Sequence, residues 1–348
     1  MIDLSDVQIA ARVQEVAGTQ AAVTDEWMEK ANVVGLGVGL KEVAGKLMDE
    51  LSLCVFVSQK LPPDVLSPDD LVQKTKSPPK EVTEAIEGAT GKQISTDIVE
   101  VGQIFAGVEA PHVGAQSLTG RIRPAMGGFS VGHKDITAGT IATAVYERLR
   151  GGYGIPPRYY ILSNNHVLAN TNAGSLGDAV LQPGPYDGGT LPADSIARLS
   201  RFVPIQLEPP IPRARHRNLV DAALAEVPFE DCNREIYWIG YLKGWRTRAE
   251  VPIGLMVQKT GRTTNYTIGR VTHIHATVDV NYGGGRKARF RDQILTTPMS
   301  APGDSGSMVS DLDEKAVGLL FAGSSRTTVI SYIEHVQNLL DIVVAENP

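Results

Sequence analysis

A serine in a glycine-rich turn is the feature that most constrains how this chain of 348 residues can fold. The segment 301–307 reads Ala-Pro-Gly-Asp-Ser-Gly-Ser and lies between two apolar-rich segments, 292–299 and 308–321. Glycine on both sides of Ser305 removes bulk around the hydroxyl and permits backbone conformations that other residues avoid. The pattern predicts a tight turn that presents a nucleophile.

Two backbone amides in this turn can point in the same direction. We expect the N–H groups of Gly303 and Ser305 to form an oxyanion hole, which stabilises the negative charge that develops on a carbonyl oxygen during acyl transfer. A Gly-Asp-Ser-Gly motif also occurs by chance in glycine-rich loops. A catalytic interpretation therefore requires partners for the serine.

A serine hydroxyl is a weak nucleophile until a base takes its proton and a carboxylate orients that base. Of the seven histidines, only His166 stands where a β-branched and aromatic run gives way to a polar loop. Asp221 opens the strand-like segment 222–227 and is predicted to orient His166. Asp178 and Asp187 are alternatives for that role, but neither opens a strand.

Three motifs carry a resemblance to the chymotrypsin-like (trypsin-fold) serine proteases, in the bacterial form without disulfides. They are Ser-Asn-Asn-His-Val at 163–167, Asp-Ala-Ala-Leu at 221–224 and Gly-Asp-Ser-Gly-Ser at 303–307. Their order along the chain and their spacing, 55 and 84 residues between the proposed triad members, fit that family. The resemblance covers about residues 118–346. It implies a serine endopeptidase whose catalytic residues are His166, Asp221 and Ser305.

The resemblance also implies a mainly β fold with two six-stranded antiparallel β-barrels, preceded here by a small N-terminal α+β domain. We expect the N-terminal domain at 1–105, a linker at 106–117 and the protease domain at 118–348. The boundary between barrel one (118–235) and barrel two (236–348) falls near Tyr237. The N-terminal domain carries no visible catalytic residues, so it is either a regulatory or substrate-presenting domain or a structural cap.

Secondary structure within these domains follows from hydrophobic periodicity. The expected elements are a helix within 1–31, strands at 32–40, 51–58 and 96–104, a flexible turn at 282–287 and a C-terminal helix at 330–344. Glycines alternate at positions 35, 37 and 39 in the first of these strands. We interpret them as one strand face kept bare so that another element can pack closely.

Substrate-binding residues follow from the resemblance. It places Met299 in one wall of the pocket beside Ser305, and Phe321 and Gly323 on an edge strand that binds a peptide backbone as an added strand. No aspartate stands at the pocket base, and neither wall carries a histidine or an arginine. We therefore expect cleavage after a small or medium apolar residue.

In many relatives the residue at the Asp304 position pairs with an N-terminal amine that is freed by proteolytic activation. No clear activation sequence is present here, and the nearest candidate, Val113-Gly114, is weak. We expect a protease that is assembled without that cleavage and is open to regulation by its own N-terminal domain.

Composition limits the partners. A formal net charge of −6 argues against nucleic acid or an anionic membrane, and no run of eighteen apolar residues exists. Two cysteines and an N-terminus without a secretory pattern favour a cytoplasmic location. Protein or peptide substrates are expected, with no cofactor and no metal; His273 and His275 have no cysteine or carboxylate cluster near them in sequence.

Two other functions remain open. A trypsin-like fold can serve as a non-catalytic binding or scaffold module when triad residues are lost, although all three are present here. An esterase can use the same triad, but this nucleophile lacks the Gly-x-Ser-x-Gly elbow of α/β-hydrolases, and the histidine precedes the serine.

Overall fold

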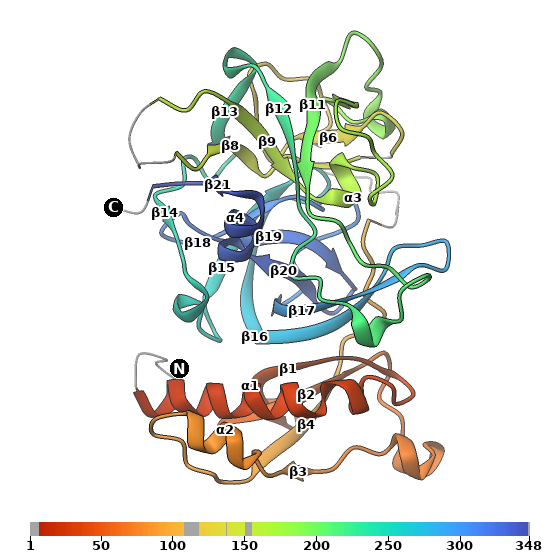
Figure 1. Cartoon of the computed structure of the whole chain (residues 1–348), viewed down its shortest axis with the longest axis vertical. Coiled ribbons are helices and arrows are strands. Elements are labelled where there is room, and N and C mark those ends of the chain that lie inside the picture. The colour runs from red at the N-terminus through yellow and green to blue at the C-terminus, as the bar shows by residue number, and fades with distance from the viewer. Residues whose placement is uncertain (1–6, 108–117, 137, 150–154, 347–348) are drawn as a thin grey trace.

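Strands form most of the regular structure in the computed structural model, which describes residues 7–107, 118–136, 138–149 and 155–346. Two β-barrels are stacked above a smaller N-terminal layer (Figure 1). Most of the predicted linker at 106–117, including the weak cleavage candidate Val113-Gly114, lies outside the described residues. The helices in the described ranges are all too short or too polar to cross a membrane.

The second barrel is closed by six strands. Its order is β15-β18-β19-β20-β17-β16, and β16 pairs back to β15. The strands are β15 (Met256–Gly261), β16 (Asn265–Asn281), β17 (Lys287–Thr296), β18 (Met308–Asp311), β19 (Lys315–Gly323) and β20 (Thr328–Tyr332). Ser305 lies in the connection between β17 and β18.

The first barrel also closes, because the consecutive strands β7 and β8 act together as one strand that joins the two ends of the sheet. β7 pairs with β6, and β8, which follows β7 after two residues, pairs with β9. The strands are β6 (Ser130–His133), β7 (Gly139–Thr140), β8 (Thr143–Glu147), β9 (Tyr159–Ser163), β10 (Ala179–Leu181), β11 (Ser195–Phe202) and β12 (Ala223–Val227). The two antiparallel barrels expected from the sequence are confirmed.

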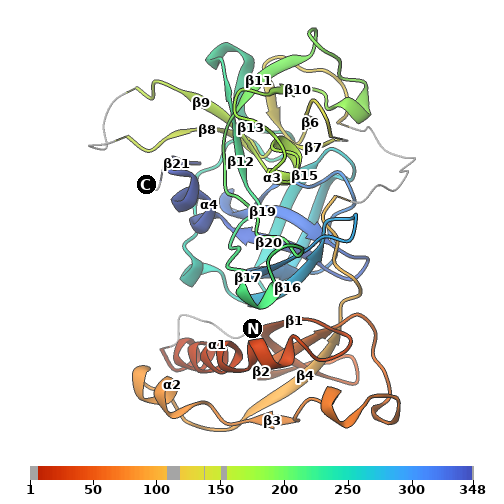
Figure 2. The ribbon, with the colours of Figure 1, turned by 45° about the vertical axis from the view of Figure 1, so that its right-hand side comes forward.

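The N-terminal layer shares a sheet with the second barrel. It contains α1 (Val7–Trp27), β1 (Val33–Val43), β2 (Lys46–Val57), β3 (Thr75–Lys76), α2 (Lys80–Ala85) and β4 (Ile94–Glu100). β15 pairs with residues 265–270 of β16, and β1 pairs with residues 273–278 of that strand. Helix α1 lies along β1 and β2 (Figure 2). It contributes Val16 and Trp27 to a core that also contains Ile274 and Ile294 of the second barrel. The domain boundary at 105 remains a prediction.

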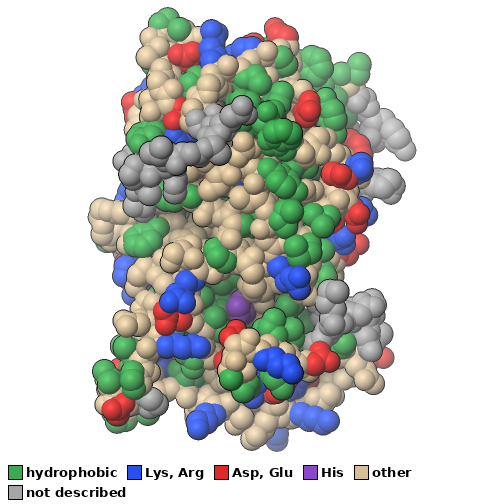
Figure 3. All heavy atoms as spheres, turned by 180° about the vertical axis from the view of Figure 1, so that it is seen from behind, with side chains coloured by type: hydrophobic (Ala, Val, Ile, Leu, Met, Phe, Trp, Pro, Cys, Tyr) green, Lys and Arg blue, Asp and Glu red, His purple; other side chains and the backbone are tan. Residues whose placement is uncertain are grey.

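The remaining strands and α-helices of the described residues are short. They are β5 (Ala125–Gly127), α3 (Asn165–Leu168), β13 (Cys232–Ile236), β14 (Gly244–Trp245), α4 (Ile333–Leu340) and β21 (Ile342–Val343). On the face opposite that of Figure 1, side chains of both charges are interspersed (Figure 3).

Two sequence-based element boundaries were wrong. The expected C-terminal helix at 330–344 is only α4, because residues up to Tyr332 belong to β20 and residues 342–343 form β21. The strands expected at 32–40 and 51–58 both extend into the segment between them, since β1 and β2 pair down to Val43 and Lys46. In both places the tertiary pairing overrides the local pattern.

The alternating glycines of β1 allow close packing, as predicted. A Cβ atom on Gly35 would lie 2.7 Å from both a ring carbon of Phe56 and the carbonyl oxygen of Thr277. A Cβ on Gly37 would lie 2.7 Å from Phe56, and one on Gly39 would lie 2.4 Å from the ring of His273. Contacts this short leave no room for a side chain.

Replacing Gly35 tests this packing. We expect Gly35→Val to lower the free energy of unfolding by at least about 1–3 kcal/mol, because it inserts atoms into an already filled space. Urea denaturation measures the change. Gly120→Ala is the matched control, since a Cβ on Gly120 meets no atom within 4 Å. Equal stability of the two variants would contradict the close-packing interpretation.

Candidate active site

His166 and Asp221 are brought together by two neighbouring strands. β9 ends at Ser163 just before His166, and β12 begins just after Asp221; the two strands pair with Ala223 opposite Ser163. His166 Nδ1 lies 2.6 Å from Asp221 Oδ2, and the His166 backbone N–H donates to Asp221 Oδ1 at 3.2 Å. A carboxylate only accepts, so Nδ1 carries the proton and Nε2 of a neutral ring is an acceptor.

Tyr282 is a site residue that sequence reasoning missed, because the segment 282–287 reads as a flexible turn. Its side chain is buried, and its hydroxyl donates to Asp221 Oδ2 at 2.8 Å. Burial, together with the negative charge of Asp221, raises the pKa of Tyr282 well above its ordinary value. The hydroxyl therefore stays protonated and acts as a second donor to the buried carboxylate.

The alternative partners of His166 are engaged elsewhere. Asp178 Oδ2 lies 3.0 Å from His133 Nε2, and Asp187 forms an ion pair with Arg262. The carboxylate that contacts His166 is thus that of Asp221, the one predicted from its position at the mouth of a strand.

The turn that carries Ser305 is fastened to the first barrel by Thr140. The Thr140 N–H donates to the Ser305 carbonyl at 2.7 Å, and Thr140 Oγ1 donates to the Gly303 carbonyl at 2.9 Å. Ser163, at the end of the strand that leads to His166, donates through Oγ to the Thr140 carbonyl at 2.7 Å. Within the described residues His166 Nε2 is buried and has no hydrogen-bond partner, so it is not bonded to the Ser305 hydroxyl.

The peptide between Pro302 and Gly303 has a defined orientation. The Asp304 N–H donates to the Ala301 carbonyl at 3.0 Å, and Gly303 has φ +96°, which together describe a type II turn. Thr263 Oγ1 donates to the Pro302 carbonyl at 2.8 Å. Because the peptide is planar and trans, its N–H points away from Thr263. Neither this N–H nor that of Ser305 donates to another described residue.

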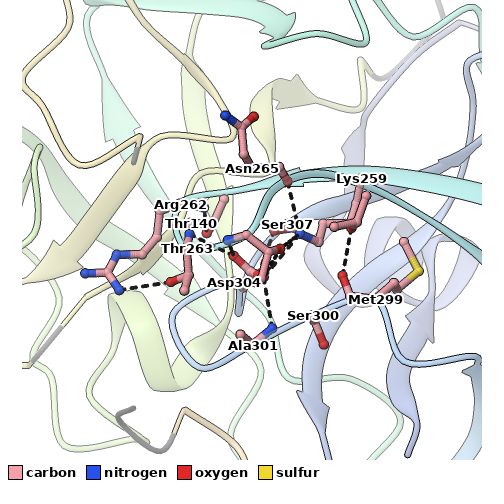
Figure 4. A network of polar contacts seen from close by, with 12 residues as sticks. Thr140, Lys259, Arg262, Thr263, Asn265, Met299, Ser300, Ala301, Asp304 and Ser307 are labelled. Atoms are coloured by element: carbon pink, nitrogen blue, oxygen red, sulfur yellow. Dashed lines mark hydrogen bonds and ion pairs between the residues drawn. The ribbon is translucent and has the colours of Figure 1, made fainter. Parts of the chain in front are cut away.

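Asp304 is the buried anchor of the same turn (Figure 4). Its carboxylate accepts from the backbone N–H groups of Ala301, Thr263 and Thr264 at 3.0, 2.9 and 3.1 Å. The Thr264 hydroxyl donates at 2.6 Å, and Lys259 Nζ lies 3.1 Å from Oδ2. The side chain therefore holds the Ser305 turn against the loop after β15.

Lys259 supplies an internal positive charge to Asp304, a second residue that the sequence reasoning missed. Its ammonium faces three acceptors: Asp304 Oδ2, Thr264 Oγ1 and the carbonyl of Asn265. Burial lowers the pKa of Lys259, and the Asp304 carboxylate opposes that shift. Three acceptors match the three N–H donors of the charged form.

The three predicted substrate-binding residues lie on the expected segments. The Met299 and Phe321 side chains are buried; Met299 contacts Gly269, and the Phe321 ring packs on Phe290 with centroids 4.7 Å apart. Gly323 is the last residue of β19 and forms a backbone pair with Phe105. A role for any of them in substrate binding remains a prediction.

Within the described ranges, no group of three or more His, Cys, Asp or Glu side chains is placed to hold an ion. His273 packs edge-on against Phe56, whereas His275 lies 2.8 Å from Asp292. The two histidines thus have separate environments.

Solved structures similar to this chain are chymotrypsin-like bacterial serine proteases. Thermobifida fusca protease A is 14% identical, with 64% of this chain and 98% of that chain covered at a TM-score of 0.44. The Nocardiopsis protease is 19% identical at the same coverage and TM-score. Cellulomonas bogoriensis chymotrypsin is 18% identical, with 62% and 96% covered at 0.41. No family model matches the chain, and no curated protein matches it.

Substituting Lys259 tests the buried ion pair. We expect Lys259→Met to lower the free energy of unfolding by about 3–5 kcal/mol, because Asp304 would stay buried without a cation. Urea denaturation measures the loss. Lys243→Met is the matched control: Lys243 pairs with Glu314 at 2.7 Å but is exposed, so the expected change is below about 1 kcal/mol. Similar losses in the two variants would contradict the anchoring role.

Proposed function

We propose that the protein is a serine endopeptidase that hydrolyses peptide bonds through Ser305, His166 and Asp221. The observation that carries the proposal is the hydrogen-bonded series from Tyr282 through Asp221 to His166, which orients the imidazole. This series leaves His166 Nε2 as a hydrogen-bond acceptor. The turn that carries Ser305 is held near the end of β9, because Thr140 bonds both to Ser163 at that strand end and to Ser305.

In the proposed mechanism the Ser305 hydroxyl attacks the scissile carbonyl while His166 Nε2 takes its proton. Asp221 stabilises the imidazolium that forms. His166 then gives the proton to the leaving amine, which departs and leaves an acyl-enzyme on Ser305. Water attacks the acyl group in the second half of the reaction, with His166 again as base, and the hydroxyl is restored.

The first step requires the Ser305 hydroxyl to come within hydrogen-bond reach of His166 Nε2. Catalytic hydrogen bonds commonly tighten only when substrate is bound, so the missing bond is compatible with the proposal. The N–H groups of Gly303 and Ser305 would hold the oxyanion. The turn orientation supports this assignment, since Thr263 donates to the Pro302 carbonyl and Thr140 to the Gly303 carbonyl, which belong to the peptides on either side of Gly303.

The proposed preference is for a small or medium apolar residue before the scissile bond. A Cβ atom on Gly323 would lie 3.4 Å from Ser300 Oγ, so the two predicted walls approach each other closely. This close approach, together with the lack of a charged residue in either wall, favours a small side chain over Lys or Arg.

Location is part of the proposal. Cys54 and Cys232 are both free thiols, and Cys54 is buried in the core. Burial raises the pKa of the Cys54 thiol to about 12, which keeps it protonated and unreactive. Two unpaired cysteines agree with a reducing compartment such as the cytoplasm.

A fluorophosphonate probe tests the nucleophile. We expect the wild type to be labelled covalently at Ser305, with labelling abolished in Ser305→Ala and slowed at least about a hundredfold in His166→Ala. Peptide mapping by mass spectrometry locates the adduct. Ser310→Ala is the control, because its buried hydroxyl has no partner among the described residues. An unlabelled wild type, or label retained in Ser305→Ala, would favour the non-catalytic module.

A peptide library tests the preference. We expect the peptides cleaved by the wild type, and not by Ser305→Ala, to end in small or medium apolar residues such as Ala or Val. Mass spectrometry of the products gives the profile. A profile dominated by Lys or Arg would overturn the specificity assignment without affecting the assignment of the triad.

A further inference from the structure

We infer that residues 104–106, here called the strap, are an internal ligand of the peptide-binding edge, so that a substrate must displace the strap before it can bind there. The inference rests on the proposed function, because it assigns Gly323 to substrate binding. It goes beyond that function by identifying residues 104–106 as the segment bound at Gly323, and displacement of this segment as the step that limits activity.

Phe105 makes both hydrogen bonds of an antiparallel pair with Gly323. The Phe105 N–H donates to the Gly323 carbonyl at 3.0 Å, and the Gly323 N–H donates to the Phe105 carbonyl at 3.0 Å. These are the two backbone groups of Gly323 that an added peptide strand would need. In this structure both are already bonded.

The strap is held from its other side as well. The Asn281 N–H donates to the Ile104 carbonyl at 2.9 Å, and the Ala106 N–H donates to the Asn281 carbonyl at 3.0 Å. Ile104 and Ala106 are buried, whereas Phe105 between them is 37% exposed. This alternation is that of a strand with one face in the core, so residues 104–106 lie as an added strand between Gly323 and Asn281.

The end of the strap reaches the catalytic histidine. Ala106 and Gly107 line a cavity of about 490 Å³ together with His166 and Tyr282. A Cβ atom on Gly107 would lie 3.3 Å from His166 Nε2. Gly107 has φ +55°, so the extended conformation ends there. The strap therefore fills the edge as far as Gly107, where its extended conformation ends beside the imidazole.

The strap is also linked to the triad through consecutive residues. Asn281 uses its N–H and its carbonyl on the strap, and the next residue, Tyr282, donates to Asp221. Displacing residues 104–106 thus changes the anchoring of the residue before Tyr282. The strap and the Asp221 carboxylate are therefore both hydrogen-bonded to the same short segment, Asn281-Tyr282.

A proline at position 105 removes the hydrogen bond from the residue 105 N–H to the Gly323 carbonyl and changes no other residue. Phe105→Pro has no N–H for Gly323, so we expect hydrolysis of a small-residue peptide substrate to rise about three- to tenfold, the effect of losing one backbone hydrogen bond. Phe105→Ala is the matched control, because it keeps the N–H and shortens only a partly exposed side chain. Its rate is expected to stay within about twofold of wild type.

Hydrogen exchange on the unmodified full-length protein gives a second readout that does not depend on how the proline variant folds. A peptide boronic acid ending in a boronic analogue of alanine is the probe, bound at Ser305. We expect the amides of Phe105 and Ala106 to be protected in the free protein and to exchange at least about tenfold faster with the probe bound. The Gly323 amide should stay protected, since it changes partner.

The two assays separate the inference from the proposed function. A wild type that is neither labelled by fluorophosphonate nor bound by the boronic acid would refute the proposed function and the inference with it. If the wild type reacts with both probes but Phe105 and Ala106 keep their protection, the triad stands and the internal ligand is wrong. A labelled, folded Phe105→Pro variant with wild-type hydrolysis would overturn the inference in the same way.

Discussion

The buried carboxylate of Asp304 is the constraint on which the Ser305 turn depends. A carboxylate out of water needs a full set of donors, and Asp304 obtains them from three backbone amides, a threonine hydroxyl and the Lys259 ammonium. Those donors come from the turn itself, at Ala301, and from β15 and the loop that follows it. Satisfying the charge therefore fixes the backbone around Gly303 and Ser305 in one conformation.

The rest of the site depends on strand pairing between segments that are far apart in the chain. β9 and β12 carry His166 and Asp221 to the same end of the first barrel, and Thr140 joins that end to the Ser305 turn of the second barrel. The site is thus built across the contact between two barrels. Each barrel closes its own sheet, which gives the groups rigid supports.

The sequence allowed a prediction wherever a functional or packing residue lies in a short, recognisable motif. His166, Asp221 and Ser305 each stand in a short pattern, and the alternating glycines of β1 signal close packing within a few residues. Tyr282 and Lys259 carry no such signal. A tyrosine in a glycine-rich turn and a lysine in a strand look solvated until the fold brings Asp221 and Asp304 to them, 61 and 45 residues away. The C-terminal helix was overestimated because all five residues of β20 are buried, so this strand lacks the alternation of buried and exposed positions that marks a half-buried strand.

The pairing of β1 with β16 has a consequence for handling the protein. β15 covers only the first part of one edge of β16, and β1 covers residues 273–278 beyond it. Trimming the chain to its two barrels would uncover that stretch of backbone donors and acceptors. An uncovered strand edge recruits other chains, so a shortened version is expected to self-associate unless the bare stretch is charged or capped.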